Sequence, residues 1–96
     1  MIVRIVHMFF RPHALEQLMP LIHRQLRNVM SHPGCLAVKL FRDTSDPDHL
    51  CTFSIWEDQE ALDDYRQSDH FIEVWSTLKS HFAKPPQAYS FKDRTP

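Results

Sequence analysis

The sequence predicts a single α+β domain, residues 1–96, in which a four-stranded antiparallel sheet carries helices on one face. Segments rich in β-branched and aromatic residues alternate with segments whose apolar residues recur every three or four positions. A polar loop that contains Pro47 joins two of the apolar segments, as in an antiparallel hairpin. The chain length is typical of one domain with a modest core.

Residues 2–10 form the first predicted strand, and both of its faces are mostly apolar. One face carries Val3, Ile5, His7 and Phe9, and the other carries Ile2, Arg4, Val6, Met8 and Phe10. A strand that is apolar on both sides is covered on both sides, which helices on one face of a single sheet cannot achieve. We therefore expect a homodimer, because an identical subunit is the simplest cover for the free face.

After Pro12, the spacing predicts an amphipathic helix that extends to Ser31. Its apolar residues are Leu15, Leu18, Met19, Ile22, Leu26, Val29 and Met30. Because Pro20 lies inside this segment, we expect a kink near it, or a short first turn that leads into a second helix. Gly34 is the only glycine in the chain and fits a left-handed cap after the helix.

Residues 35–42 and 50–57 are predicted to be the second and third strands, paired as a hairpin. The pairing would place Cys51 beside Phe41 and leave Cys35 at the other end of the hairpin. The two sulfur atoms are then too far apart for a disulfide, so we expect free thiols.

Two further helices are predicted at residues 59–66 and 69–82, followed by a last strand at residues 87–92. Asp58 and Ser68 are suitable N-caps for the two helices. The resulting order is β-α-β-β-α-β, in which the second helical region is divided. This is the ferredoxin-like arrangement.

The composition excludes several classes of protein. A net charge of −1 and a third strand without basic residues argue against nucleic-acid binding. The first apolar run is too short to span a membrane and is not followed by a small-residue cleavage site, so we expect a cytoplasmic protein. The seven histidines show no HxxxH or HExxH spacing, so a metal site is not expected.

From Trp56 to Trp75 the chain reads W-E-D-x-E-A-L-x-x-Y-R-x-S-x-x-F-x-x-x-W. With the predicted element order, this run resembles the antibiotic biosynthesis monooxygenase family, which includes quinol monooxygenase-like proteins. The resemblance covers nearly the whole chain. It implies a dimeric α+β barrel in which two sheets pack face to face, with a small cavity between each sheet and its helices.

The chain departs from the family pattern at two positions. Many members carry a glutamate two residues before the strand-ending tryptophan, where this chain has Ser54. Haem-degrading relatives bind iron through a histidine at the position of Trp75, although His70 lies five residues away. We therefore do not expect haem, and a chain with one glycine has no phosphate-binding loop for a flavin, so we expect no cofactor.

The resemblance implies an oxygenase of small aromatic or quinol-like compounds that uses neither flavin nor metal, because the deprotonated substrate itself reduces oxygen. Such a site needs a dry aromatic pocket, a base and a donor for the developing oxyanion. The candidates are Trp56, Phe71, His70 and Trp75 for the pocket, His7 for the base with His70 as a second choice, and Tyr65 or Arg66 for the donor.

Each candidate also has a structural interpretation. Large aromatic residues usually pack a core, and His70 and Arg66 can be exposed surface groups. His7 either has a structural hydrogen-bond partner or lines a polar cavity. The alternative function is a non-catalytic barrel that binds a small ligand or serves only in assembly.

Overall fold

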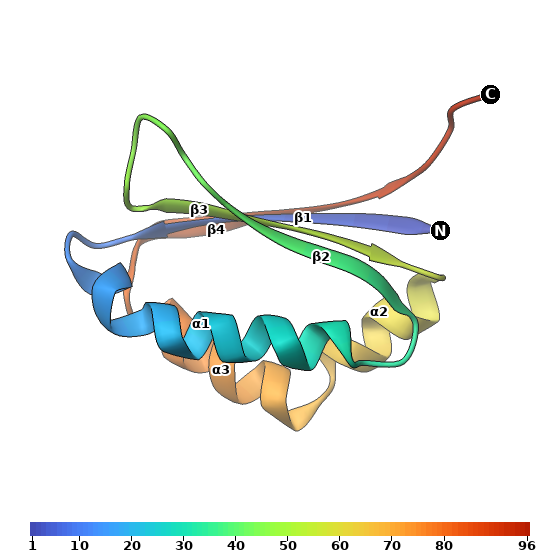
Figure 1. The fold of residues 1–96 in the computed structure, drawn as a ribbon, viewed down its shortest axis with the longest axis horizontal. Helices are drawn as coiled ribbons and strands as arrows, with labels where there is room; N and C mark the ends of the chain where they lie inside the picture. The colour runs from blue at the N-terminus through green and yellow to red at the C-terminus, as the bar shows by residue number, and fades with distance from the viewer.

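The molecule consists of one sheet and one layer of helices. In the computed structural model, which describes residues 1–96, the strands pair antiparallel in the order β2-β3-β1-β4. The elements are β1 (Ile2–Phe10), α1 (Ala14–Met30), β2 (Cys35–Arg42), β3 (His49–Trp56), α2 (Gln59–Arg66), α3 (Asp69–Lys79) and β4 (Phe82–Lys92). All three helices cover the same face of the sheet (Figure 1). This architecture confirms the predicted ferredoxin-like fold.

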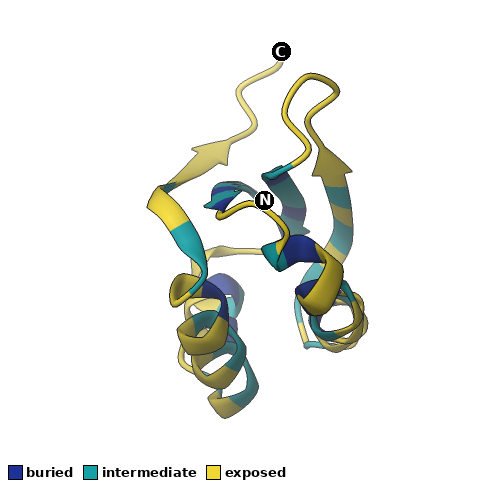
Figure 2. Ribbon diagram, turned by 90° about the vertical axis from the view of Figure 1, so that its left-hand side faces the viewer, coloured by how far each residue is buried: buried dark blue, intermediate teal, exposed yellow.

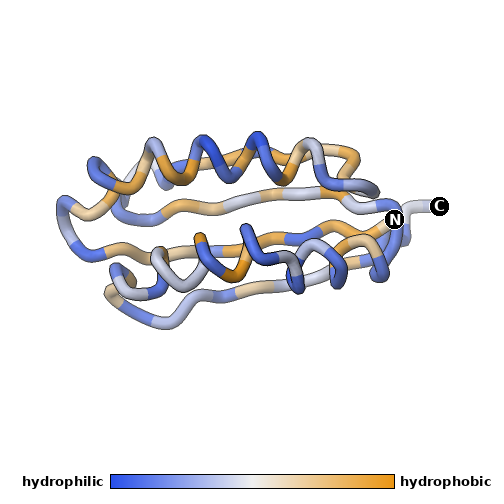
Figure 3. Tube along the Cα trace, turned by 90° about the horizontal axis from the view of Figure 1, so that it is seen from below, coloured by the Kyte–Doolittle hydropathy of each residue, from blue (hydrophilic) through white to orange (hydrophobic).

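The helices form two rows beneath the sheet. Seen from the helix side, α1 runs along one row and α2 and α3 along the other (Figure 3). The hairpin loop between β2 and β3 and the C-terminal tail project away from the helices and are exposed (Figure 2). None of the helices is both long and apolar enough to cross a lipid bilayer.

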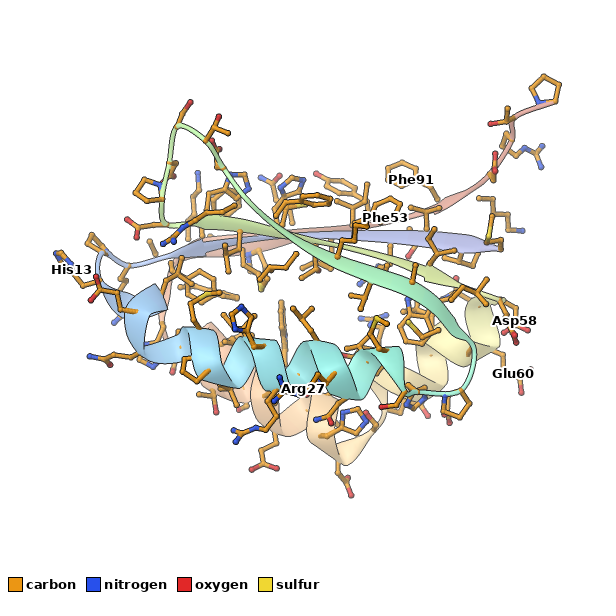
Figure 4. The ribbon with its side chains drawn as sticks, in the orientation of Figure 1. His13, Arg27, Phe53, Asp58, Glu60 and Phe91 are labelled. Carbon is orange, nitrogen blue, oxygen red and sulfur yellow. The ribbon has the colours of Figure 1, made fainter.

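The strand register decides which side chains face the helices. Ile5 of β1 pairs with Phe53 of β3 and with Tyr89 of β4, so these three side chains share the sheet face away from the helices. Phe53 and Phe91 are seen on that side in Figure 4. We call this surface the outer sheet face; its main residues are Val3, Ile5, His7, Phe9, Phe41, Cys51, Phe53, Ile55, Tyr89 and Phe91.

Helix α1 is continuous through Pro20, so of the two predicted alternatives, a kink or a division into two helices, the division is wrong. Pro20 removes the N–H that would bond the carbonyl of Glu16. Both residues are exposed, so water can satisfy that carbonyl without a break in the helix.

The end of α3 and the start of β4 also differ from the prediction. Helix α3 ends at Lys79, and Phe82 begins β4 by pairing with Phe10. The strand continues through Pro85 and Pro86 because they lie at a register shift in an edge strand, where no amide donor is needed. Phe82 therefore shares no helical face with Phe71 and Trp75, although its ring packs edge-on against Trp75.

Gly34 has the left-handed conformation predicted for it, with φ 88°, but it is not the helix cap, because α1 ends at Met30 and its C-cap is Ser31. Its carbonyl accepts a hydrogen bond from the Glu57 N–H at 2.9 Å, which joins the start of β2 to the end of β3. A methyl group at Gly34 would overlap the Ala61 methyl. Glycine is thus required here for its backbone angle and for the close approach of α2.

The buried core is divided into two clusters. One contains Met8, Phe10, Leu15, Leu18, Ile22, Leu50 and Leu78, and the other contains Ile2, Val29, Trp56, Leu62 and Tyr65. Side chains from both clusters border a pocket that lies between the sheet and the helices. The pocket therefore lies between the two clusters, and each of them contributes part of its wall.

Candidate functional site

The pocket has a volume of about 330 Å³, which is the size of a small-molecule site. Fourteen of its nineteen lining residues are hydrophobic. Val6 and Met8 of β1 form part of its roof, whereas Ile22 of α1 and Leu78 of α3 belong to its helical wall. A cavity of this kind favours an apolar ligand with a few polar groups.

Four aromatic residues predicted from the sequence line this pocket together: Trp56, Tyr65, Phe71 and Trp75. Trp56 stacks on Tyr65 with ring centroids 5.1 Å apart, and Tyr65 meets Phe71 edge-on at 5.0 Å. Phe71 in turn stacks on Trp75 at 5.9 Å. The four rings form a continuous aromatic wall, an arrangement suited to a planar aromatic ligand.

Short-range hydrogen bonds fix the position of this wall. The indole N–H of Trp56 donates to the Ser54 hydroxyl at 3.0 Å, and the ring is fully buried. Asp58 caps α2, and Ser68 caps α3 by accepting the Phe71 N–H, as predicted. Ser54, which stands where many family members have glutamate, therefore serves to orient Trp56.

The main polar group of the aromatic wall is the Tyr65 hydroxyl. Gln25 Nε2 donates a hydrogen bond to it at 2.9 Å, and the hydroxyl donates to no other group of the chain. Burial raises the pKa of Tyr65 to about 12, so the phenol stays protonated at neutral pH. Its proton is thus available to a ligand in the pocket.

Gln25 is one of two buried polar residues in the protein. Its side chain also lies 3.3 Å from His70 Nδ1 and accepts a hydrogen bond from Asn28. Sequence analysis missed Gln25, although its position, three residues after Ile22 and four before Val29, places it on the apolar face of α1. A polar residue within an apolar stripe was the signal that could have identified it.

Two arginines also line the pocket, Arg4 of β1 and Arg66 at the end of α2. They are the only charged side chains among the lining residues. Arg4 donates a hydrogen bond to the Ser90 hydroxyl at 2.9 Å. Burial, followed by the nearby charge of Arg66, lowers the pKa of Arg4. Arg66 was a sequence candidate, whereas Arg4 was overlooked although it shares a strand face with Val6 and Met8.

His7, the first candidate for the base, does not line the cavity. Since Val6 and Met8 face the pocket, strand alternation directs His7 to the outer sheet face. There its Nδ1 lies 2.9 Å from His49 Nε2, and the His49 Nδ1 lies 2.8 Å from an Asp43 carboxylate oxygen. The structural alternative, a hydrogen-bonded partner for His7, is what the structure shows.

His70, the second candidate base, does not line the pocket. It approaches the site only through Gln25, and its ring lies 5.7 Å from that of Tyr65. No histidine or carboxylate therefore borders the pocket directly, and the pocket offers no imidazole to a haem iron.

Comparison with known proteins agrees with this fold. Residues 1–81 match the model of the family described as antibiotic biosynthesis monooxygenase. A crystal structure of an antibiotic biosynthesis monooxygenase superposes with a TM-score of 0.94, at 28% identity over 100% of both chains. The structure of SnoaB from Streptomyces nogalater, described as a cofactor-independent oxygenase, has a TM-score of 0.83 at 17% identity, covering 99% of this chain and 95% of that one.

A curated relative, an uncharacterized protein from Synechocystis, is 24% identical over 85% of this chain. The chain spans only 56% of that protein's length. With the family model covering most of the chain, the class of protein is established. The chain belongs to the antibiotic biosynthesis monooxygenase family.

Proposed function

We propose that this protein is a cofactor-independent monooxygenase that acts on a small aromatic or quinol-like compound. The main support is the aromatic pocket in which Gln25 holds the neutral Tyr65 hydroxyl with its proton free. The family membership supports the same class of reaction.

The reaction that fits this pocket is the conversion of a phenol to a quinone. The bound phenol loses its proton, and the resulting anion supplies the electrons that reduce O₂. One oxygen atom becomes the new carbonyl and the other leaves as water with the two hydrogens that the phenol gives up, so no external reductant is required. Tyr65 would donate a hydrogen bond to the oxyanion that develops on the substrate.

The pocket has no side chain that could act as a general base, and this restricts the substrate. Because no histidine or carboxylate lines the walls, the substrate must lose its proton to water, and its anion must be as easily oxidised as that of a quinol. The positive charges of Arg4 and Arg66 would favour its ionised form. The absence of a histidine or carboxylate from the pocket also favours a second candidate function, a barrel that binds an aromatic ligand without reaction.

Oxygen uptake separates the two functions. With a naphthol or naphthoquinol substrate, we expect uptake above the rate of spontaneous oxidation, and ¹⁸O₂ should label one product oxygen. Tyr65→Phe should lower the rate by roughly tenfold to a hundredfold, whereas Tyr89→Phe, a matched change on the outer sheet face, should not change it. Binding without protein-dependent oxygen uptake would leave only the ligand-binding function.

We also propose that the protein is a homodimer joined through the outer sheet face. Phe41, Tyr89 and Phe91 on this face are each about half exposed, with Phe53 and Ile55 between them. A continuous apolar surface of this kind is uncommon on a monomer. A second copy would cover it, as the face-to-face packing of two sheets in the family barrel implies.

The two cysteines are free thiols in the structure. Free thiols are typical of reducing compartments, which supports our proposal that the protein is cytoplasmic.

A further inference from the structure

Arg4 and Arg66 form a concentration of positive charge that the fold does not neutralise. Both of the protein's salt bridges join a histidine to an aspartate, so neither guanidinium is in ion-pair contact with a carboxylate. Asp63 is close enough for its charge to act on Arg4, but its carboxylate accepts a hydrogen bond from Gln59 instead. Partly buried cations are normally paired, so the missing ion-pair partner of Arg4 needs an explanation.

The two arginines approach the same pocket from different layers. Arg4 extends from the sheet and is only partly exposed, whereas Arg66 belongs to the helical layer and is exposed. Arg66 therefore lies where the pocket meets solvent. The charges of Arg4 and Arg66 repel each other, and an anion between them would remove that repulsion.

Arg4 and the Tyr65 hydroxyl are held by different layers of the fold. Arg4 is hydrogen-bonded to Ser90 on β4, whereas the Tyr65 hydroxyl is hydrogen-bonded to Gln25 on α1. A ligand can therefore present its reacting hydroxyl to Tyr65 and a second polar group to the guanidinium pair. Its aromatic body would occupy the apolar space between them.

We infer that the pocket binds aromatic compounds that carry a permanent anionic group, such as a carboxylate, and that Arg4 and Arg66 together hold this group. Guanidinium groups suit this task because they bind carboxylates through paired hydrogen bonds. The inference rests on the proposed use of the pocket for a small aromatic ligand and specifies the charge of that ligand.

The test compares two probes of similar size, 2-naphthoate and the neutral 2-naphthalenemethanol, by titration calorimetry. The wild type should bind naphthoate at least roughly tenfold more tightly than the alcohol, as expected for charge-assisted hydrogen bonds. Arg4→Met and Arg66→Gln should each reduce this preference by about tenfold. Arg24→Gln, an equal change of charge on the exposed face of α1, should leave it unchanged.

Thermal melting and circular dichroism would show that each variant is folded. Equal affinity for the two probes, or an unchanged preference in both pocket variants, would overturn the anion inference. Failure of both probes to bind at millimolar concentration would overturn it together with the proposed function. A strong preference for naphthoate, together with no oxygen uptake in the presence of a naphthol or naphthoquinol, would support the anion inference and contradict the monooxygenase proposal.

Discussion

His7 and His49 are hydrogen-bonded to each other, with 2.9 Å between His7 Nδ1 and His49 Nε2, on the sheet face opposite the aromatic pocket. The Asp43 carboxylate holds the other nitrogen of His49. The pair thus belongs to the surface that we assign to the dimer interface. A histidine in this position can support a hydrogen-bond network but cannot contact a ligand beneath the sheet.

We therefore predict that His7→Asn leaves the pocket intact. Binding of 2-naphthoate and kcat/KM for a quinol should change by less than about twofold, because the side chain touches no part of the cavity. Calorimetry and oxygen uptake on the same preparation measure both quantities, with Tyr65→Phe as the positive control. A loss of roughly a hundredfold in His7→Asn, with unchanged melting behaviour, would return His7 to the catalytic site.

The buried Tyr65 hydroxyl should make the protein sensitive to alkali. Its pKa is raised from 10.0 to about 12 in the fold, so between these values the unfolded chain loses the proton while the folded protein keeps it. The free energy of unfolding therefore falls as pH rises above 10, by about 1 kcal/mol between pH 9 and pH 11. Urea unfolding at the two pH values measures this loss.

In Tyr65→Phe this alkaline loss should shrink by about 1 kcal/mol. The variant should also be less stable at neutral pH, by about 1 to 3 kcal/mol, because Gln25 loses its buried partner. Tyr89→Phe on the outer sheet face should show the same alkaline loss as the wild type. An equal loss in all three proteins would mean that Tyr65 ionises freely in the fold.

A charge at the centre of the outer sheet face should separate the proposed dimer. Phe53 lies in the middle of β3 and pairs with Ile5, so Phe53→Glu would place a carboxylate within the apolar interface. Sedimentation at micromolar concentration should show a dimer for the wild type and a monomer for the variant. Ile72→Glu is the control, because Ile72 is also apolar and is exposed, but lies on α3.

A monomeric wild type would contradict the dimer proposal. A dimer that persists in Phe53→Glu but dissociates in Ile72→Glu would place the interface on the helices instead.

The unpaired Arg4 should reduce the stability of the ligand-free protein. Burial and the charge of Arg66 both disfavour its charged form, so its folded pKa lies below its unfolded pKa and the penalty is fully present at neutral pH. We expect Arg4→Met to raise Tm by about 2 to 5 °C, as is common when strain at a binding site is removed. Scanning calorimetry at pH 7 measures the change.

Arg24→Met on the exposed face of α1 is the matched control and should shift Tm by less than about 1 °C. A lower Tm in Arg4→Met would show that the hydrogen bond to Ser90 makes Arg4 a structural residue.

The sequence by itself determined the order of the elements and the aromatic content of the site. Periodicity depends on neighbours within a few residues, so the strands, the helices and the caps at Asp58 and Ser68 were readable from local spacing. The predictions that a proline ends or divides an element were wrong where the tertiary structure tolerates the proline. Pro20 stays within α1 because its side of the helix faces water, and Pro85 stays within β4 because that strand is an edge.

Only the tertiary structure decided which side of the sheet faces the cavity. The first strand is apolar on both sides, so its sequence could not show whether Arg4 or His7 lies beneath the helices. Gln25 and Tyr65 are forty residues apart in the chain, and no local pattern connects them. Contacts of this kind arise when helices pack on one face of the sheet, and that packing made Arg4, rather than His7, a pocket residue.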